Sequence, residues 1–198
     1  MPVEVLSYML SNRDIEKRLQ FQLILQCAPF LKGIKVACVT NIEEKYLGGL
    51  KKVLRDTGIK YKVLIINRGR CLVFFYREGE FLTYLNKREV REFLETYGYQ
   101  ADNLEAVLER LSFRVCQYSC KDICFPHEIG AFLDYPIDDV RCFIEQKGRE
   151  YLIAGYWKVY HNPEKAQMIF LAYDKAKASA VNEFLTGKSI RDIVYKAA

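Results

Sequence analysis

The chain has 198 residues, of which 51% are hydrophobic and 28% are charged, and its formal net charge is +5. This balance excludes an intrinsically disordered chain and provides enough apolar side chains for a buried core. Charged residues interrupt every apolar run well before the about 18 residues that a membrane-spanning helix needs, so no membrane span is expected.

The first half of the chain alternates between helical and strand periodicity. The expected elements are a helix over 14–31 with Asn12 or Asp14 as its N-cap, a strand over 34–40, a helix over 42–57 that Gly58 ends, and two strands over 61–66 and 71–76 joined by a hairpin turn at residues 67–70. The Asn-Arg-Gly-Arg sequence of that turn is typical of tight hairpins, which favour Asn and Gly.

The second half is mainly helical. Helices are expected over 87–97 and 101–117, a helical hairpin broken at prolines over about 126–147, a strand over 155–160, a long helix over 163–185 ended by Gly187, and a last short helix capped by Ser189. The pattern predicts an α/β fold of the α+β type, with a small mixed sheet of about four strands covered by helices. A single domain over 1–198 is the simplest division, and a looser subdivision near residue 100 stays open.

Two runs of residues carry a resemblance to a known family. Residues 125–136 read FPHEIGAFLDYP, Asp139-Val140 follow, and residues 155–160 read GYWKVY. They resemble an uncharacterised family, a domain of unknown function common in anaerobic Gram-positive bacteria, whose members share F-P-H-E-I-G-x-F-L-G-Y-P-x-x-D-V and G-Y-W-K-V-Y runs. The resemblance implies a bacterial cytosolic protein and transfers no activity.

Two positions depart from the family pattern, because Asp134 and Cys142 stand where glycines are usual. The chain is expected to turn at position 134. Aspartate is among the few residues other than glycine that tolerate a left-handed backbone, so we expect the fold to be kept.

His127 and Glu128 are the first candidate site residues. Pro126 suits the first turn of a helix, which would place both at a helix N-terminus. There the helix dipole disfavours an imidazolium, so a neutral imidazole is expected, competent as a base or a metal ligand. The alternative is structural: Glu128 caps the helix and His127 packs against its neighbours.

A second group of candidates lies on the expected strand over 155–160. Alternation would bury Trp157 and present Tyr156, Lys158 and Tyr160 on the other face, where tyrosines flanking a lysine can stack on a ligand. With Tyr135, these residues suggest a cleft. The leading hypothesis is a noncatalytic binding or regulatory protein that recognises a small molecule or protein at His127, Glu128, Tyr135, Trp157, Lys158 and Tyr160.

The alternative hypothesis uses cysteine chemistry. Cys116, Cys120 and Cys124 are spaced four apart, and His127 follows three residues later. Three thiolates and an imidazole suit zinc or an iron-sulfur cluster, in a redox protein or a thiol-dependent enzyme. On a continuous helix the outer thiols would lie about 12 Å apart, so only a break after Cys120 would gather them.

The remaining patterns bear on location and partners. The first 13 residues lack the features of a signal peptide, and the seven cysteines are odd in number and scattered, so free thiols in the cytoplasm are expected. Residues 129–143 have the spacing of a helix-turn-helix pair. Asp138 and Asp139 on its second helix would repel phosphates, and nucleic acid is therefore an unfavoured partner.

Overall fold

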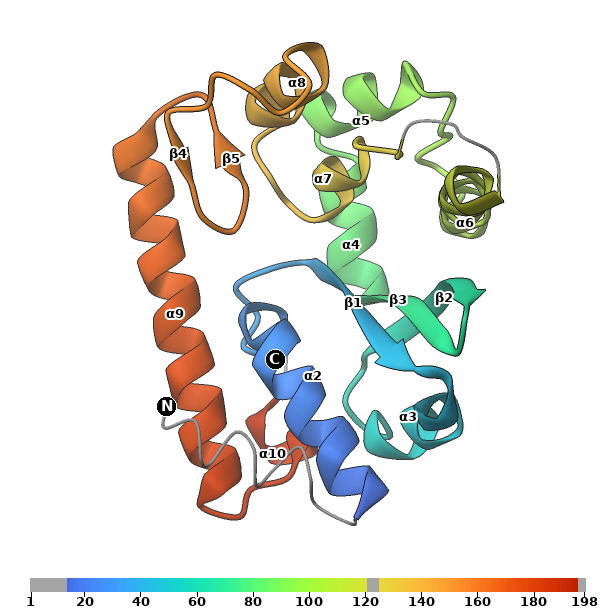
Figure 1. Cartoon of the computed structure of the whole chain (residues 1–198), viewed down its shortest axis with the longest axis vertical. Coiled ribbons are helices and arrows are strands. Elements are labelled where there is room, and N and C mark those ends of the chain that lie inside the picture. Colours follow the sequence, from blue (N-terminus) through green and yellow to red (C-terminus); the bar gives the residue numbers. More distant parts are fainter. Residues whose placement is uncertain (1–13, 121–124, 196–198) are drawn as a thin grey trace.

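The computed structural model describes residues 14–120 and 125–195 (Figure 1). In chain order the elements are α2 (Ile15–Leu31), β1 (Ala37–Glu43), the 3₁₀ helix η1 (Glu44–Tyr46), α3 (Leu47–Val53), β2 (Lys60–Asn67), β3 (Arg70–Tyr76), α4 (Glu78–Leu85), α5 (Arg88–Glu95), α6 (Leu104–Cys120), α7 (Ile129–Phe132), α8 (Ile137–Glu145), β4 (Ile153–Ala154), β5 (Lys158–Val159), α9 (Pro163–Leu185) and α10 (Ile190–Ile193). The α+β class, the helical hairpin and the long C-terminal helix are confirmed.

The strands form two antiparallel sheets rather than one mixed sheet. The first has the order β1-β3-β2, and the second is the short hairpin β4-β5. Arg68 and Gly69 in the β2–β3 turn have φ angles of 47° and 73°, the left-handed values that a two-residue hairpin turn of type I′ requires. Because β4 and β5 pair with each other, the second half of the chain adds no strand to the main sheet.

The central strand β3 is buried on both faces, and alternate residues enter different clusters. Cys71, Val73 and Phe75 join the cluster formed with α2, α3, α9 and α10. Phe74 and Tyr76 join the cluster formed with α4 to α8. The sheet therefore separates two apolar layers. The candidate residues His127, Glu128 and Tyr135 lie beside α7 and α8 of the second layer, whereas Trp157 belongs to a third, smaller cluster with Val159 and residues of α9.

The long helix α9 connects the two ends of the molecule (Figure 1). Its C-terminal half packs on α2, where Phe184 stacks on Phe21 with ring centroids 5.7 Å apart and Glu183 pairs with Lys32. Its N-terminal half packs on the β4–β5 hairpin, where Phe170 meets Trp157 edge-on at 4.6 Å. One continuous helix thus fixes the small hairpin relative to the N-terminal layer.

The turn between α7 and α8 forms as the sequence indicates. Asp134 has φ 60°, so the chain does turn there with a left-handed backbone. Gly130 lets the two helices approach closely, because a Cβ added there would lie 3.0 Å from Val140 Cγ2 and 3.3 Å from Tyr135 Cδ2. The structure thus accounts for both the turn residue and the glycine of this run.

Several local boundaries differ from expectation. Helix α4 was not predicted, and the expected helix over 42–57 begins later, with η1. The expected strand over 155–160 is reduced to Lys158–Val159, because residues 155–157 form the bend between β4 and β5. No helix in the described ranges is both long and apolar enough to cross a bilayer.

Candidate functional site

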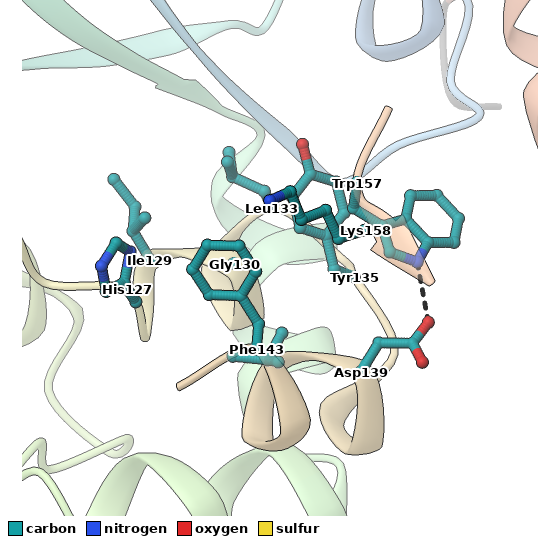
Figure 2. A pocket seen from close by; sticks show the side chains of 10 residues that line it. His127, Ile129, Gly130, Leu133, Tyr135, Asp139, Phe143, Trp157 and Lys158 are labelled. Atoms are coloured by element: carbon teal, nitrogen blue, oxygen red, sulfur yellow. Dashed lines mark hydrogen bonds between the residues drawn. The ribbon is translucent and has the colours of Figure 1, made fainter. Parts of the chain in front are cut away.

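The candidate site consists of two neighbouring hollows beside α7 and α8. The smaller hollow has a volume of about 170 Å³ and the larger hollow about 620 Å³. The smaller hollow is lined by His127, Ile129, Gly130, Leu133, Tyr135, Asp139, Val140, Phe143, Trp157 and Lys158. Figure 2 shows Phe143 between His127 and Trp157 in this hollow.

Trp157 is oriented by the buried carboxylate of Asp139. Its indole Nε1 donates to Asp139 Oδ2 over 2.8 Å, the dashed line in Figure 2. Asp139 Oδ1 accepts from the backbone N–H groups of Tyr160 and His161, each over 2.9 Å. Asp139 is only 2% exposed, so these donors replace the water it has lost. The carboxylate fixes the hairpin against α8 and is already occupied by protein donors.

Tyr135 and Lys158 complete the wall beside Trp157. The Tyr135 ring stacks on the indole with centroids 5.2 Å apart, and the Lys35 ammonium lies 4.8 Å from the Tyr135 ring centroid. Lys158 Nζ donates to the carbonyl of Gly148 over 2.6 Å. Because Lys158 is held in this way, its aliphatic part lines the hollow while its charge is directed at a backbone carbonyl.

His127 lies in the turn before α7, not within a helix. The helix begins at Ile129, with Glu128 as its N-cap residue and no side-chain capping bond, so the expected dipole argument does not apply. The His127 ring is exposed and packs edge-on against Phe143 at 4.9 Å. Burial lowers the pKa of the imidazole below its ordinary value, although the Glu128 carboxylate opposes the shift. The imidazole is therefore neutral at pH 7.

The larger hollow lies on the other side of His127 and Phe143, which line both. Its walls are Tyr97, Arg114, Phe125, His127, Glu128, Phe143, Ile144 and Lys147. The Glu128 carboxylate is 1% exposed, pairs with Arg114 Nε, and accepts from the Tyr99 hydroxyl over 3.0 Å. Burial, together with the charge of Glu128 and this hydrogen bond, raises the pKa of Tyr99. Glu128 is the N-cap residue of α7, but the alternative that its side chain caps this helix is wrong, because the carboxylate bonds to Arg114 of α6.

The structure brings four of the six predicted binding residues together in the smaller hollow: His127, Tyr135, Trp157 and Lys158. Glu128 faces the larger hollow. Tyr160 lines neither hollow and is 9% exposed, so the expectation of an outward-facing tyrosine is wrong. The bond from its backbone N–H to Asp139 draws this residue inward.

The metal hypothesis lies largely outside the described residues. Cys116 is exposed on α6, whereas Cys124 and the side chain of Cys120 are not among the residues described. Within the described ranges, no three His, Cys, Asp or Glu residues are placed to hold a metal ion. Zinc or iron-sulfur binding by Cys116, Cys120, Cys124 and His127 stays a prediction.

The comparison with protein families assigns the chain. The model of a family described as a protein of unknown function, DUF3793, matches residues 23–194. The chain belongs to this family. The match includes both hollows, since their lining residues lie between Tyr97 and Lys158. No curated protein and no solved structure matches the DUF3793 chain significantly.

Sequence reasoning missed three residues of the DUF3793 site. Asp139 was noted as part of the family run and as a charge that would repel phosphates, but not as a site residue, yet it organises the hairpin. Phe143 and Arg114 have no local signal, because their role depends on contacts with residues at least 14 positions away. The sequence offered one clue to Asp139: it lies in the family run, next to Val140 and in the first turn of the expected helix.

Proposed function

We propose that this DUF3793 protein is a noncatalytic binding protein that holds a small apolar group, about the size of one aromatic ring, in the smaller hollow. The observation that carries the proposal is the convergence of His127, Tyr135, Trp157 and Lys158 on one hollow. These residues come from the turn before α7, the α7–α8 turn and the β4–β5 hairpin.

The size of the hollow supports a ring-sized ligand. Its volume of about 170 Å³ is similar to the about 150 Å³ of an apolar protein cavity that binds benzene. The walls are mostly apolar or aromatic side chains, and rigid aromatic walls bind ligands at a low cost in conformational entropy.

The absence of a complete catalytic set supports binding over catalysis. Asp139 and Lys158 are engaged with protein partners. The imidazole nitrogens of His127 make no hydrogen bond to the described residues, so this side chain could accept a proton as a base. No Ser, Thr or Cys from the described part of the chain lines this hollow, and a base alone provides neither a nucleophile nor an orienting group.

The test uses Trp157, the one tryptophan in the sequence, as a reporter of the hollow. We expect titration with toluene or cyclohexanol to change the emission of Trp157 saturably and to leave the probe chemically unchanged. His127→Ala removes one wall and should weaken binding about five-fold. Phe113→Ala is the matched control, since Phe113 carries an exposed ring on α6 and lines neither hollow. Emission that no probe alters would refute the proposal.

A cytoplasmic location in a bacterium remains part of the proposal. It is supported by the buried thiols of Cys27, Cys38 and Cys71, which form no disulfide among the described residues. Zinc and iron content of anaerobically purified protein, with its visible spectrum, tests the metal alternative separately. Stoichiometric metal would favour that alternative.

A further inference from the structure

We infer that the ligand is an organic carboxylate whose apolar body fills the smaller hollow and whose anionic group lies in the larger hollow, beside Arg114 and Lys147. The inference rests on the proposed function, because the apolar body is held where that function places it. It adds a chemical class for the ligand and a role for the larger hollow.

The two hollows share a wall, which makes one ligand in both feasible. His127 and Phe143 line both, and their rings meet edge-on with centroids 4.9 Å apart. Phe125 continues this row on the side of the larger hollow, 5.4 Å from the His127 ring. A ligand that occupies both hollows would therefore extend past these side chains, of which the His127 ring is exposed, and the chain-length series below measures the linker that this takes.

The charges around the larger hollow favour a single negative charge. Arg114 and Lys147 contribute two cations, Glu128 contributes one carboxylate, and His127 is neutral, which leaves a net charge of +1. A net positive hollow attracts anions, and a single excess charge matches a monoanion such as a carboxylate better than a dianionic phosphate.

The donors that an incoming carboxylate needs are present. Arg114 Nε is paired with Glu128, but within the described residues the two terminal nitrogens of the guanidinium, Nη1 and Nη2, donate to no hydrogen bond. The Lys147 side chain is exposed and pairs with no carboxylate in the described ranges. The planar donor pair of a guanidinium matches the two oxygens of a carboxylate.

The aromatic walls strengthen this interaction. Tyr97, Phe125 and Phe143 line the larger hollow together with the two cations, and their rings would exclude water from a carboxylate bound there. A charge interaction is stronger where less water screens it. Tyr97 also lies under the Arg114 guanidinium at 5.7 Å, which helps to keep the donor group in place.

The test compares phenylalkanoates of increasing chain length with the phenylalkanols of the same length, again by Trp157 emission. At low ionic strength we expect the best acid to bind about five- to ten-fold more tightly than its alcohol, and this preference to shrink at high salt. The preference should peak at one chain length, at which the alkyl linker extends past the His127 and Phe143 side chains.

Two variants locate the anion. Lys147→Asn should reduce the preference for the acid about three-fold and leave alcohol binding unchanged. Asparagine tolerates the left-handed backbone of Lys147, which has φ 52°. Arg68→Asn is the matched control, because Arg68 is exposed, has φ 47° and lies in the distant β2–β3 turn. Glu128→Gln should raise the preference, since it removes the one carboxylate of the larger hollow.

The outcomes separate the two proposals. Equal affinity for acid and alcohol, or an equal loss of the preference in the Lys147→Asn and Arg68→Asn variants, would overturn the carboxylate inference and leave the proposed function standing. Failure of both probe series to alter Trp157 emission would overturn both. A salt-sensitive acid preference that Lys147→Asn alone reduces would establish the inference.

Discussion

The two walls of the candidate site are each held by one buried carboxylate, and the two carboxylates have different partners. Glu128 holds the wall before α7 by bonds to the side chains of Arg114 and Tyr99. Asp139 holds the wall formed by α8 and the hairpin by bonds to one indole and two backbone N–H groups. One wall therefore depends on a side-chain ion pair, and the other mainly on indole and backbone N–H donors, with the His161 imidazole Nδ1 3.3 Å from Asp139 Oδ1.

The difference follows from how much regular structure each wall contains. The β4 and β5 strands have two residues each and provide few ladder hydrogen bonds. A carboxylate that accepts from consecutive backbone N–H groups replaces part of the missing ladder. Glu128 instead lies beside the well-formed helix α6, where it neutralises a cation. The buried Asp139 carboxylate thus holds the backbone of the hairpin in place, whereas the buried Glu128 carboxylate neutralises the charge of Arg114.

The largest effect is expected from Asp139→Asn. Both oxygens of Asp139 accept hydrogen bonds, so the amide NH₂ would face donors and leave some of them unpaired. We expect a loss of about 3 kcal/mol in the free energy of unfolding. Urea denaturation followed by Trp157 emission measures it. Asp138→Asn, one residue away and exposed, is the control and should cost less than about 1 kcal/mol.

Gly155→Ala tests the same wall without changing any polar group. A Cβ at position 155 would lie 2.2 Å from Phe170 Cε2, the ring that packs on Trp157. The ring must move, and we expect a loss of about 2 kcal/mol in thermal or urea unfolding. Gly79→Ala is the control, because a Cβ there meets no atom within 4 Å inside α4 and should be neutral or stabilising. Equal effects at both glycines would contradict the packing argument.

Glu183→Gln tests a carboxylate far from both walls. The bond to Lys32, with help from Ser179 and Lys188, lowers the pKa of Glu183 to about 2, from an ordinary value of 4.5. The ionised form is therefore favoured by folding, and its contribution is present above pH 4.5 and lost as the pH falls toward 2.

We expect Glu183→Gln to cost about 1 to 2 kcal/mol at pH 7, less than the full pKa shift implies, because solvent screens a pair whose side chains are 22% and 23% exposed. The difference between the wild type and the variant should shrink between about pH 4.5 and 2, measured by urea denaturation at several pH values. A difference that is independent of pH would show that packing, rather than the carboxylate charge, stabilises this contact.

The smallest effect is expected from Glu128→Gln. Arg114 Nε and the Tyr99 hydroxyl both donate to the same oxygen, Oε1, and a glutamine retains that acceptor. We expect a loss of about 1 kcal/mol, clearly less than for Asp139→Asn. Parallel urea titrations of the two amide variants measure the contrast. An equal loss would mean that the charge of Glu128, and not its acceptor geometry, holds this wall.

Local signals identified most of the helices and strands. Asp14 caps α2 by accepting from the N–H groups of Glu16 and Lys17, and Ser189 forms a capping box with Asp192. The bounds of α9 agree with the sequence because Pro163 and Gly187 mark its two ends. Helix α4 was not predicted because it is much less amphipathic than α5, which has the same length. The strand over 155–160 was predicted too long because residues 155–157 form a bend.

The sequence by itself determined the α+β class, the caps, the left-handed turn at Asp134 and the segment that forms the site. These features depend on neighbouring residues in the chain, so local patterns reveal them. Only the tertiary structure decided that His127 lines both hollows, that Glu128 and Tyr160 turn inward, and that Asp139 orients Trp157. Burial and hydrogen bonding across 14 or more residues depend on how distant elements pack, and no local pattern contains that information.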